Sequence, residues 1–338
     1  MFLSVGVRFE ANVEALNAVE TTGNYSKHRR VPYLFYFPED QEFKVIYVPA
    51  LSGESLAHAY QETLVEEARA LYGENPPICE ECSRGEFFKS MSDEYARKKL
   101  EAIFGEKAES LLKEPVKVEE AILKACLVED IGGFLYAGKP PVKRTSRFQV
   151  SYALPVKKAA LYSVTEPQLH ARQAQLREIR GRSEREAASE QMIYYVETGT
   201  ALYGFVMNLD LSSIGIGAVT GKPILKEDEI EKRQKVAIRA LFRMISGRQF
   251  GAKLSRFFPV GDVVSLVVTR TEHPFSVTSP IYWGAALMTA KRLSVIKEKF
   301  GEDIQLAVYD TLEDLSELEK FDFATIADSP EGALASLF

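Results

Sequence analysis

The beginning of the chain alternates strictly between apolar and polar residues. Apolar side chains occupy every second position from Val5 to Val13, and this period of two predicts a β-strand. Residues 21–32 are polar and predict a loop. Two runs of aromatic and β-branched residues, 33–37 and 43–48, flank a Pro-Glu-Asp turn and predict a hairpin. The first part of the chain is therefore expected to form strands.

A helical periodicity replaces this alternation from residue 54 onward. Apolar residues from Leu56 to Leu71 recur three or four positions apart, which places them on one face of a helix. Two further helical patterns follow at 93–104 and 118–128. Residues 54–128 are therefore expected to be a helical insertion.

Strand patterns return in the second half of the chain and are interrupted once. Residues 166–190 contain five Arg, five Glu and no aromatic residue, so this segment can bury little surface and is expected to project as a long loop or flexible arm. The strand patterns lie at 147–154, 193–196, 201–211, 263–269 and 304–309, and helices are predicted at 226–246 and 283–300.

The order of these elements predicts an α+β fold. Without the inserted segments it reads strand, hairpin, two strands, helix, strand, helix, strand, which suits a ferredoxin-like core of the RNA-recognition-motif type. We therefore expect a discontinuous core domain, residues 1–53 and 129–338, with a helical insertion at 54–128 and a flexible, thumb-like arm at 166–190.

Charge is segregated along a chain that is acidic overall. The 338 residues have a formal net charge of -6, yet the stretches 21–38, 131–165 and 232–261 contain no Asp or Glu. Segregated basic surface favours binding of a polyanion, and the cations around Arg29 and Arg147 are interleaved with aromatic residues, which favours RNA. The alternative is that these cations line solvated surfaces, and the helix dipole accounts for part of the third stretch.

The composition disfavours secreted and membrane proteins. No apolar run approaches the length of a membrane span, and the N-terminus lacks the apolar block of a signal peptide. Three cysteines provide no disulfide framework for a chain of this length. We expect a cytoplasmic protein that makes no contact with a membrane.

Cys79 and Cys82 have the spacing of half a zinc knuckle or of a redox pair. A zinc site needs two further ligands, and the sequence supplies only Cys126 and four scattered histidines. A redox pair would follow a strand, whereas this pair follows a loop between helices. We predict surface or half-buried thiols and no metal or cofactor, and whether the pair binds a metal stays open.

The glycine-rich segment 215–222 lies between a predicted strand and a predicted helix, where a phosphate-binding loop would lie. Its spacing matches neither the dinucleotide nor the nucleoside-triphosphate pattern, and Pro223 stands where a Ser or Thr would follow the lysine. A plain glycine-rich turn is the better interpretation.

Two further positions have both a functional and an ordinary interpretation. His28, among cations, is a candidate general acid or base for RNA cleavage, or it only hydrogen-bonds a phosphate or the backbone. The predicted helix start at Ser52, Gly53 and Ser55 can offer N–H groups to a phosphate, or Ser52 simply caps the helix.

Three segments resemble those of a known family. They read VRFEAN at 7–12, ETTGNYSKHRR at 20–30 and VPALSGESL at 48–56, and a fourth, less specific segment reads GAKLSRFFP at 251–259. Together they resemble the DevR-type CRISPR-associated proteins of the RAMP superfamily, in particular the guide-RNA-binding backbone subunit of archaeal type I-A Cascade. The resemblance implies an RNA-recognition-like palm with a helical insertion and a protruding thumb, here the 166–190 arm.

The resemblance also implies a function without catalysis or cofactors. Copies would associate head to tail into a helical filament along a guide RNA (crRNA), contact other Cascade subunits and present the guide for pairing with target DNA. The alternative is a metal-independent RAMP endoribonuclease that processes guide precursors with His28 as its catalyst. A DNA-binding regulator is a third possibility, for which no helix-turn-helix pattern is present. The acidic segment 302–331 is a candidate contact with a basic face of the next copy.

The residues expected to contact RNA come from the resemblance, the arm and the charge pattern. The resemblance carries over to Asn24, Lys27, His28, Arg29, Ser52, Gly53, Ser55, Lys253 and Arg256. The arm supplies His170 and Arg172, and the charge pattern alone adds Arg30, Lys143, Arg144 and Arg147.

Overall fold

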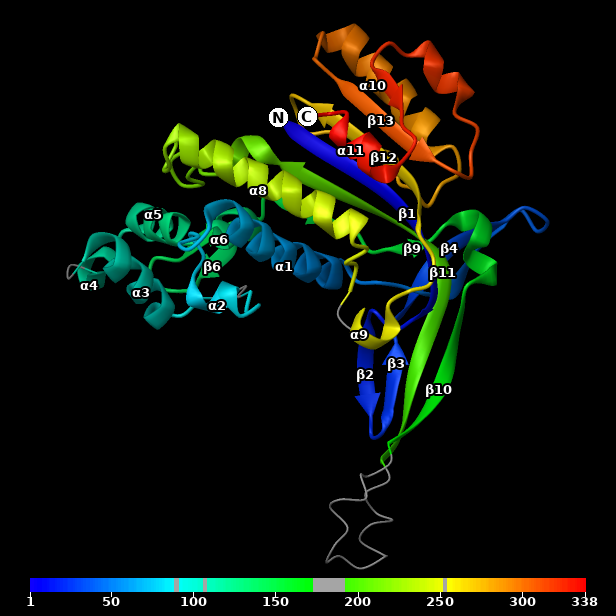
Figure 1. The fold of residues 1–338 in the computed structure, drawn as a ribbon, viewed down its shortest axis with the longest axis horizontal. Coiled ribbons are helices and arrows are strands. Elements are labelled where there is room, and N and C mark those ends of the chain that lie inside the picture. Colours follow the sequence, from blue (N-terminus) through cyan, green and yellow to red (C-terminus); the bar gives the residue numbers. More distant parts are fainter. Residues whose placement is uncertain (88–90, 106–107, 173–191, 252–253) are drawn as a thin grey trace, which may run out of the picture.

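The computed structural model confirms a mixed α+β fold (Figure 1). It describes residues 1–87, 91–105, 108–172, 192–251 and 254–338.

A central, mainly antiparallel sheet organises the molecule. β1 (Phe2–Glu14) lies between β11 (Met192–Asp210) and β12 (Val263–Thr271), so the alternating N-terminal pattern correctly predicts a strand. Shorter strands extend the sheet on both sides: β8 (Phe148–Val150) and β9 (Leu154–Pro155) beside β11, and β13 (Gln305–Asp310) and β14 (Ala324–Ile326) beyond β12.

Two long helices cover one face of this sheet. α1 (Gly53–Tyr72) and α8 (Glu227–Ser246) pack on each other, and the hydroxyl of Tyr60 donates to the carbonyl of Ala237 over 2.9 Å. Their apolar faces join Val7 and the alternate residues of β1 in one hydrophobic core. Burial of each leucine-sized side chain stabilises the fold by about 1.5–3 kcal/mol, so this core holds helices and sheet together.

The opposite face of the sheet is covered by residues 275–282. Gly6 makes room for this segment, because a Cβ at this position would lie 3.1 Å from Val277. Arg8, on the same face, is buried and donates to the carbonyl of Pro280 over 2.7 Å. β1 is therefore buried on both faces along most of its length, which its alternating pattern does not predict.

Residues 91–142, here called the helical lobe, have a second hydrophobic core. α3 (Asp93–Phe104) confirms the helix predicted at 93–104, and the element predicted at 118–128 is divided between α5 (Pro115–Ala125) and α6 (Leu127–Gly132). Because α1 shares the core of the sheet, the boundary at residue 54 stays a prediction. The shorter elements nearby are α2 (Glu80–Ser83), α4 (Ala108–Leu111), β6 (Phe134–Tyr136) and β7 (Val142–Arg144).

A ribbon of strands extends from the sheet beside α9 (Leu254–Phe257) (Figure 1). β10 (Val164–Arg172) pairs antiparallel with the first part of β11, and β3 (Tyr25–His28) pairs parallel with β11. β2 (Ala18–Thr22) pairs with β3, so the loop predicted at 21–32 is wrong. We call β2, β3, β10 and the paired part of β11 the arm base.

The predicted arm is described only in part. Its residues 166–172 belong to β10, and residues 173–190 lie outside the described ranges.

The remaining elements largely follow the sequence predictions. The hairpin is confirmed as β4 (Arg30–Phe37) and β5 (Glu42–Pro49), and the helix expected at 283–300 is α10 (Ala285–Phe300). Within the described ranges, no helix has both the length and the apolar character needed to cross a bilayer. The other short elements are η1 (Lys157–Tyr162), η3 (Leu211–Ser213), η4 (Ser316–Lys320) and α11 (Pro330–Ala335).

Candidate nucleic-acid interface

Asn17 joins the two most specific sequence segments in space. Its Oδ1 accepts a hydrogen bond from Nε of Arg29 over 3.0 Å and one from the backbone N–H of Ser52 over 2.7 Å. The guanidinium of Arg29 also lies 6.0 Å from the ring centroid of Tyr152, within cation–π range. An arginine, an exposed aromatic ring and the start of α1 therefore lie together, although they are distant in the sequence.

The start of α1 has an ordinary cap. Ser52 is buried, and its hydroxyl accepts from the backbone N–H of Ser55 over 3.1 Å, which is the capping interpretation of this serine. Gly53 lies against the backbone, since a Cβ there would be 3.0 Å from the carbonyl oxygen of Val150. Capping by one serine leaves other N–H groups in the first turn, so this end of the helix keeps its positive dipole.

An open groove of about 500 Å³ begins at this helix start. Gly53, Tyr152 and Phe148 line it together with His58, and Glu54 contributes a carboxylate to the same wall. The aromatic side chains of the groove suit a nucleic-acid base. The carboxylate of Glu54 would repel a phosphate placed next to it. A nucleic acid here would therefore place its phosphates toward Arg29 and away from Glu54.

The arm base gathers a second group of predicted residues. Asn24 holds the β2–β3 turn to β11, because its Nδ2 donates to the carbonyl of Ile193 over 2.8 Å. His170 stacks on Tyr194 with ring centroids 5.2 Å apart, and its other neighbour is Phe257 of α9 at 6.0 Å. The ring contacts with His170 thus place α9 beside the arm base.

Other predicted residues occupy or adjoin the arm base. Lys27 is exposed on β3, and Arg256 is exposed on α9. The backbone of Arg172 ends β10, and Lys253 lies outside the described residues. Arg30 is exposed at the start of β4 and donates to the carbonyl of Tyr47 over 3.0 Å.

A third group of cations and aromatic rings, which lies around η1, is not predicted from the sequence. Lys158 of η1 lies 4.0 Å from the ring centroid of Trp283, and Lys157 lies 4.8 Å from that of Tyr282. Both rings are partly exposed. The lysines belong to an acid-free stretch of the sequence, but their aromatic partners are more than a hundred residues away, so only the fold reveals the pairing.

His28 is buried in the protein interior, which corrects the prediction that it contacts or cleaves RNA. Its Nε2 lies 2.6 Å from the Glu14 carboxylate, and its Nδ1 lies 2.9 Å from the carbonyl of Arg29. Burial alone would lower the pKa of His28, but the hydrogen bond and charge of Glu14 raise it above the ordinary value. Glu14 therefore outweighs both the burial of His28 and the cations that adjoin it in the sequence.

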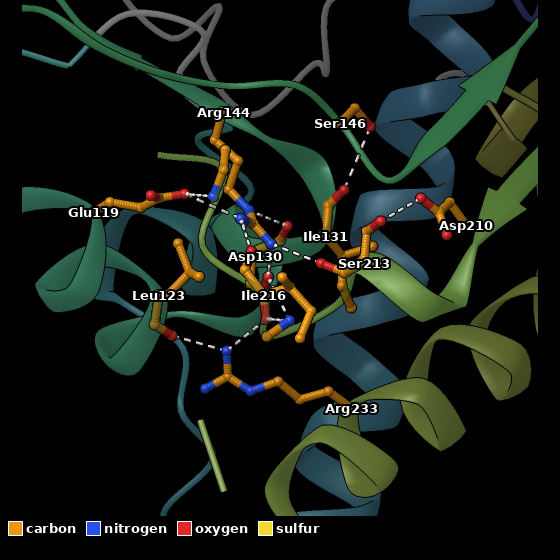
Figure 2. A network of polar contacts seen from close by, with 12 residues as sticks. Glu119, Leu123, Asp130, Ile131, Arg144, Ser146, Asp210, Ser213, Ile216 and Arg233 are labelled. Atoms are coloured by element: carbon orange, nitrogen blue, oxygen red, sulfur yellow. Dashed lines mark hydrogen bonds and ion pairs between the residues drawn. The ribbon is translucent and has the colours of Figure 1, made fainter. Parts of the chain in front are cut away.

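Arg144 is also internal, at the centre of a buried polar network (Figure 2). Its guanidinium donates to the carboxylates of Asp130 and Glu119 and, over 2.7 Å, to the carbonyl of Ile216. Arg233 of α8 donates to the other oxygen of Asp130 over 3.0 Å, which connects the helical lobe to this long helix. The predicted RNA contact of Arg144 is corrected accordingly, because internal acceptors occupy its guanidinium.

The two other cations predicted from the same stretch lie apart from the groups above. Arg147 is half-buried, and burial lowers the pKa of its guanidinium below the ordinary value. Lys143 is exposed on β7, which pairs with β6 in the helical lobe. Neither joins the groups around Arg29, the arm base or η1.

The glycine-rich segment binds carboxylates of the protein itself. The backbone N–H groups of Ala218 and Val219 donate to Glu119 over 2.6 and 3.1 Å, and that of Gly215 donates to Asp130 over 3.1 Å. These N–H groups are consequently unavailable to a phosphate, in agreement with a plain turn.

A family model and several related proteins that match this chain all belong to CRISPR-associated proteins. The family model described as "CRISPR-associated negative auto-regulator DevR/Csa2" matches residues 5–285. The chain is 37% identical over 278 residues to "CRISPR-associated aCascade subunit Cas7/Csa2 2" of Saccharolobus solfataricus, a match covering 81% of this chain and 80% of the relative. It is 27% identical over 314 residues to "CRISPR-associated protein Cas7/Cst2/DevR" of Methanocaldococcus jannaschii, covering 90% and 92%.

A solved structure shares the fold. The chain superposes on a chain of "CRISPR RNA-guided surveillance complex, pre-nicking" with a TM-score of 0.52 at 12% identity, over 100% of this chain and 99% of that chain.

Proposed function

Because this chain belongs to the DevR/Csa2 family of CRISPR-associated proteins, we propose that it is a guide-RNA-binding backbone subunit of a Cascade-type complex. Its copies associate head to tail along the guide, meet other subunits of the complex and hold the guide for pairing with target DNA. In this role the protein works in the cytoplasm and recognises the shape and the phosphates of the guide RNA. Base pairing between the guide and the target DNA provides the sequence specificity.

The strand order supports a palm of the RNA-recognition type. The order β12, β1, β11, β8, with α1 following β1 and α8 following β11, is that of a ferredoxin-like core, and all neighbours in this set are antiparallel. In RNA-recognition motifs the open sheet face binds bases. Here residues 275–282 cover that face, so the guide runs along the edge of the palm and past the arm base, which serves as the root of the thumb.

The observation that carries the proposal is the contact of Asn17 with both Arg29 and Ser52. It holds a guanidinium at a helix N-terminus beside the exposed ring of Tyr152, and these three features suit a phosphate followed by a base. Arg256 on α9 continues a cationic surface toward the arm base. A single strand can follow this surface without any sequence-specific contact.

The position of His28 supports a binder over a nuclease. A general acid or base must lie within hydrogen-bond reach of the ribose or of the leaving oxygen. The imidazole of His28 is buried, and both its nitrogens already have protein partners. The proposal therefore assigns no catalytic residue to this chain.

The test combines binding and integrity of the RNA. Purified protein is incubated with labelled guide-length RNA, with and without chelator, and the same samples are run on native and denaturing gels. Stepwise shifted bands with intact RNA are expected. Shortened RNA in chelator would instead establish the endoribonuclease, and absence of any shift would contradict both.

A variant series tests the assigned surface. Loss of one phosphate contact to single-stranded RNA lowers the log–log salt slope of affinity by about 0.7. Arg29→Ala is expected to show this loss, whereas Arg84→Ala, an exposed arginine paired with Glu80 and Glu86, is the control that keeps the wild-type slope. If Lys27, Arg29 and Arg256 can all become Ala without change in affinity or slope, the assigned surface is wrong.

A further inference from the structure

Three thiols that are far apart in the sequence meet in the fold. The sulfur atoms of Cys79, Cys82 and Cys126 all lie within 4.8 Å of one another. Cys79 precedes the short helix α2, Cys82 lies within it, and Cys126 lies between α5 and α6. Cys126 stands alone in the sequence, far from Cys79 and Cys82. Its place in this cluster is therefore visible only in the structure.

The backbone holds the two contributing segments together. The N–H of Leu127, next to Cys126, donates to the carbonyl of Pro77 over 2.8 Å. The N–H of Ser83 donates to the carbonyl of Cys79 over 2.9 Å, so the two cysteines of the pair occupy one helical turn. Cys82 and Cys126 are buried and Cys79 is half-buried, and all three are free thiols. These backbone hydrogen bonds therefore hold the segments that carry the three thiols next to one another.

The arrangement fits a tetrahedral metal site with thiolate ligands. Zinc binds cysteine sulfur at about 2.3 Å, which places tetrahedral ligands about 3.8 Å apart. The separations of up to 4.8 Å thus need only a small contraction of the side chains. A C-x2-C pair followed by distant ligands is the usual spacing of structural zinc sites.

A second observation points to the fourth ligand. Glu129 stands three residues after Cys126, which caps α6, so the two residues are neighbours on one helical turn. The Glu129 carboxylate is not one of the ligand atoms that lie within 4.8 Å of one another, and it would move toward the three sulfur atoms when a metal binds. Glu129 is 6% exposed, and its Oε2 has no hydrogen-bond partner among the described residues. Its Oε1 accepts from the buried ammonium of Lys99. A buried carboxylate oxygen without a partner is costly, and a cation ligated by it would remove that cost.

We propose that Cys79, Cys82, Cys126 and Glu129 bind one structural zinc ion. The ion would join α2 to the junction of α5 and α6, and Lys99 would offset the negative charge of three thiolates and a carboxylate around a divalent cation. Four protein ligands leave no open position, so the site is structural and separate from RNA binding.

The first experiment measures metal in the intact protein. Full-length protein is purified without added metal or chelator, and its zinc content is determined by elemental mass spectrometry. One zinc ion per chain is expected, together with a lower melting temperature after chelation that added zinc restores. Protein that lacks zinc, fails to take it up and melts unchanged with added zinc would overturn the proposal, as would a Cys79–Cys82 disulfide in metal-free protein.

Variants identify the ligands. Cys126→Ser is expected to abolish stoichiometric zinc, and Glu129→Gln to weaken zinc affinity by at least about tenfold, since even outer-shell changes cost this much. Glu80→Gln is the matched control, because this acid adjoins Cys79 in sequence but is exposed. Full zinc binding by Cys126→Ser, or unchanged affinity in Glu129→Gln, contradicts the ligand set.

Cobalt substitution covers the case in which a cysteine variant fails to fold. Wild-type protein loaded with Co²⁺ is expected to show the absorption bands of thiolate ligation and of tetrahedral geometry. A spectrum without thiolate bands would overturn the site independently of any variant. These readouts do not involve RNA, so their failure leaves the proposed guide-RNA function untouched.

Discussion

The imidazole of His28 and the carboxylate of Glu14 form a buried pair, with Nε2 and Oε1 separated by 2.6 Å. The hydroxyl of Tyr203 donates to the same carboxylate oxygen over 2.8 Å, and the N–H of Leu16 donates to the other oxygen over 2.7 Å. Glu197 approaches from β11 and accepts from the backbone N–H of His28. The segment that resembles an RNA-binding family most closely is thus anchored to the sheet by its histidine.

This pair makes stability depend on pH. The pKa of His28 is raised in the folded protein because the Glu14 hydrogen bond and charge outweigh desolvation. A raised folded pKa contributes stability below the unfolded value of about 6.5, and that contribution is lost as pH rises through the folded pKa. Each unit of upward shift corresponds to about 1.4 kcal/mol.

Urea unfolding at a series of pH values measures this dependence. We expect His28→Gln to flatten the decline in stability above about pH 6.5. His58→Gln, at an exposed histidine, serves as the control and keeps the decline. A wild-type decline that persists in His28→Gln would assign it to other groups.

Arg144→Ala tests whether this arginine serves the fold. It removes one partner from a buried ion-pair network around Asp130 and is expected to lower the free energy of unfolding by about 3–5 kcal/mol. RNA affinity per folded molecule should stay at the wild-type value. The neighbouring exposed Lys143→Ala is the comparison, with an expected change within about 0.5 kcal/mol. A folded Arg144→Ala protein with a lower salt slope for RNA would show that the residue does reach the guide.

Tyr152 is expected to stack on a base of the guide. Stacking on an aromatic side chain contributes about 1–3 kcal/mol per base, so Tyr152→Ala should weaken RNA binding by that amount and Tyr152→Phe should keep it. Tyr36→Ala is a matched control, because Tyr36 and Tyr152 are similarly exposed at 42% and 41%. Equal affinities of the Tyr152 and Tyr36 variants in a binding titration would remove Tyr152 from the interface.

Only some of the acidic side chains in segment 302–331 are free to contact a neighbouring copy of the protein, because others form ion pairs within the chain. Asp310 and Glu313 pair with the buried Arg8, so charge reversal there would disturb the fold itself. Glu317 and Glu319 of η4 are exposed and are the appropriate positions.

If this face meets a basic face of the next copy, Glu317→Lys with Glu319→Lys should reduce cooperative assembly on long RNA. Binding to an RNA that accommodates one copy should be unchanged. Native gels on both RNAs distinguish the effects, and Glu94→Lys on α3 controls for added positive charge. Undiminished cooperativity in the double variant would exclude this face.

The sequence predicts elements well where one periodicity dominates. The alternation from Val5 to Val13, the hairpin around residue 38 and the helix at 93–104 all recur in the structure. The predicted loop at 21–32 is wrong mainly because β2 and β3 belong to a narrow ribbon, in which pairing rather than burial of an apolar face maintains the strands. Local pattern carries no signal for a partner strand that lies far along the chain.

Predictions of the site were limited in a different way. Charge shows that Arg144 and His28 are polar, but not that each faces an internal carboxylate contributed by another element. Conversely, the pairing of Lys158 with Trp283 and the approach of Cys126 to Cys79 require contacts that only the fold creates. The family segments 20–30 and 48–56 indicate the region around Arg29 and Ser52, whereas Asn17, which connects the two residues, precedes both segments and belongs to neither.

The central position of β1 also governs how the chain can fold. Phe2 pairs with Asp210 and Thr271, which both lie far later in the chain. A nascent chain must therefore keep the apolar strand β1 without its neighbours until β11 and β12 have been synthesised. Such distant pairing slows folding and exposes the strand to aggregation. A chain that stops before residue 271 lacks part of a neighbour of β1, so premature termination should yield insoluble fragments rather than smaller RNA binders.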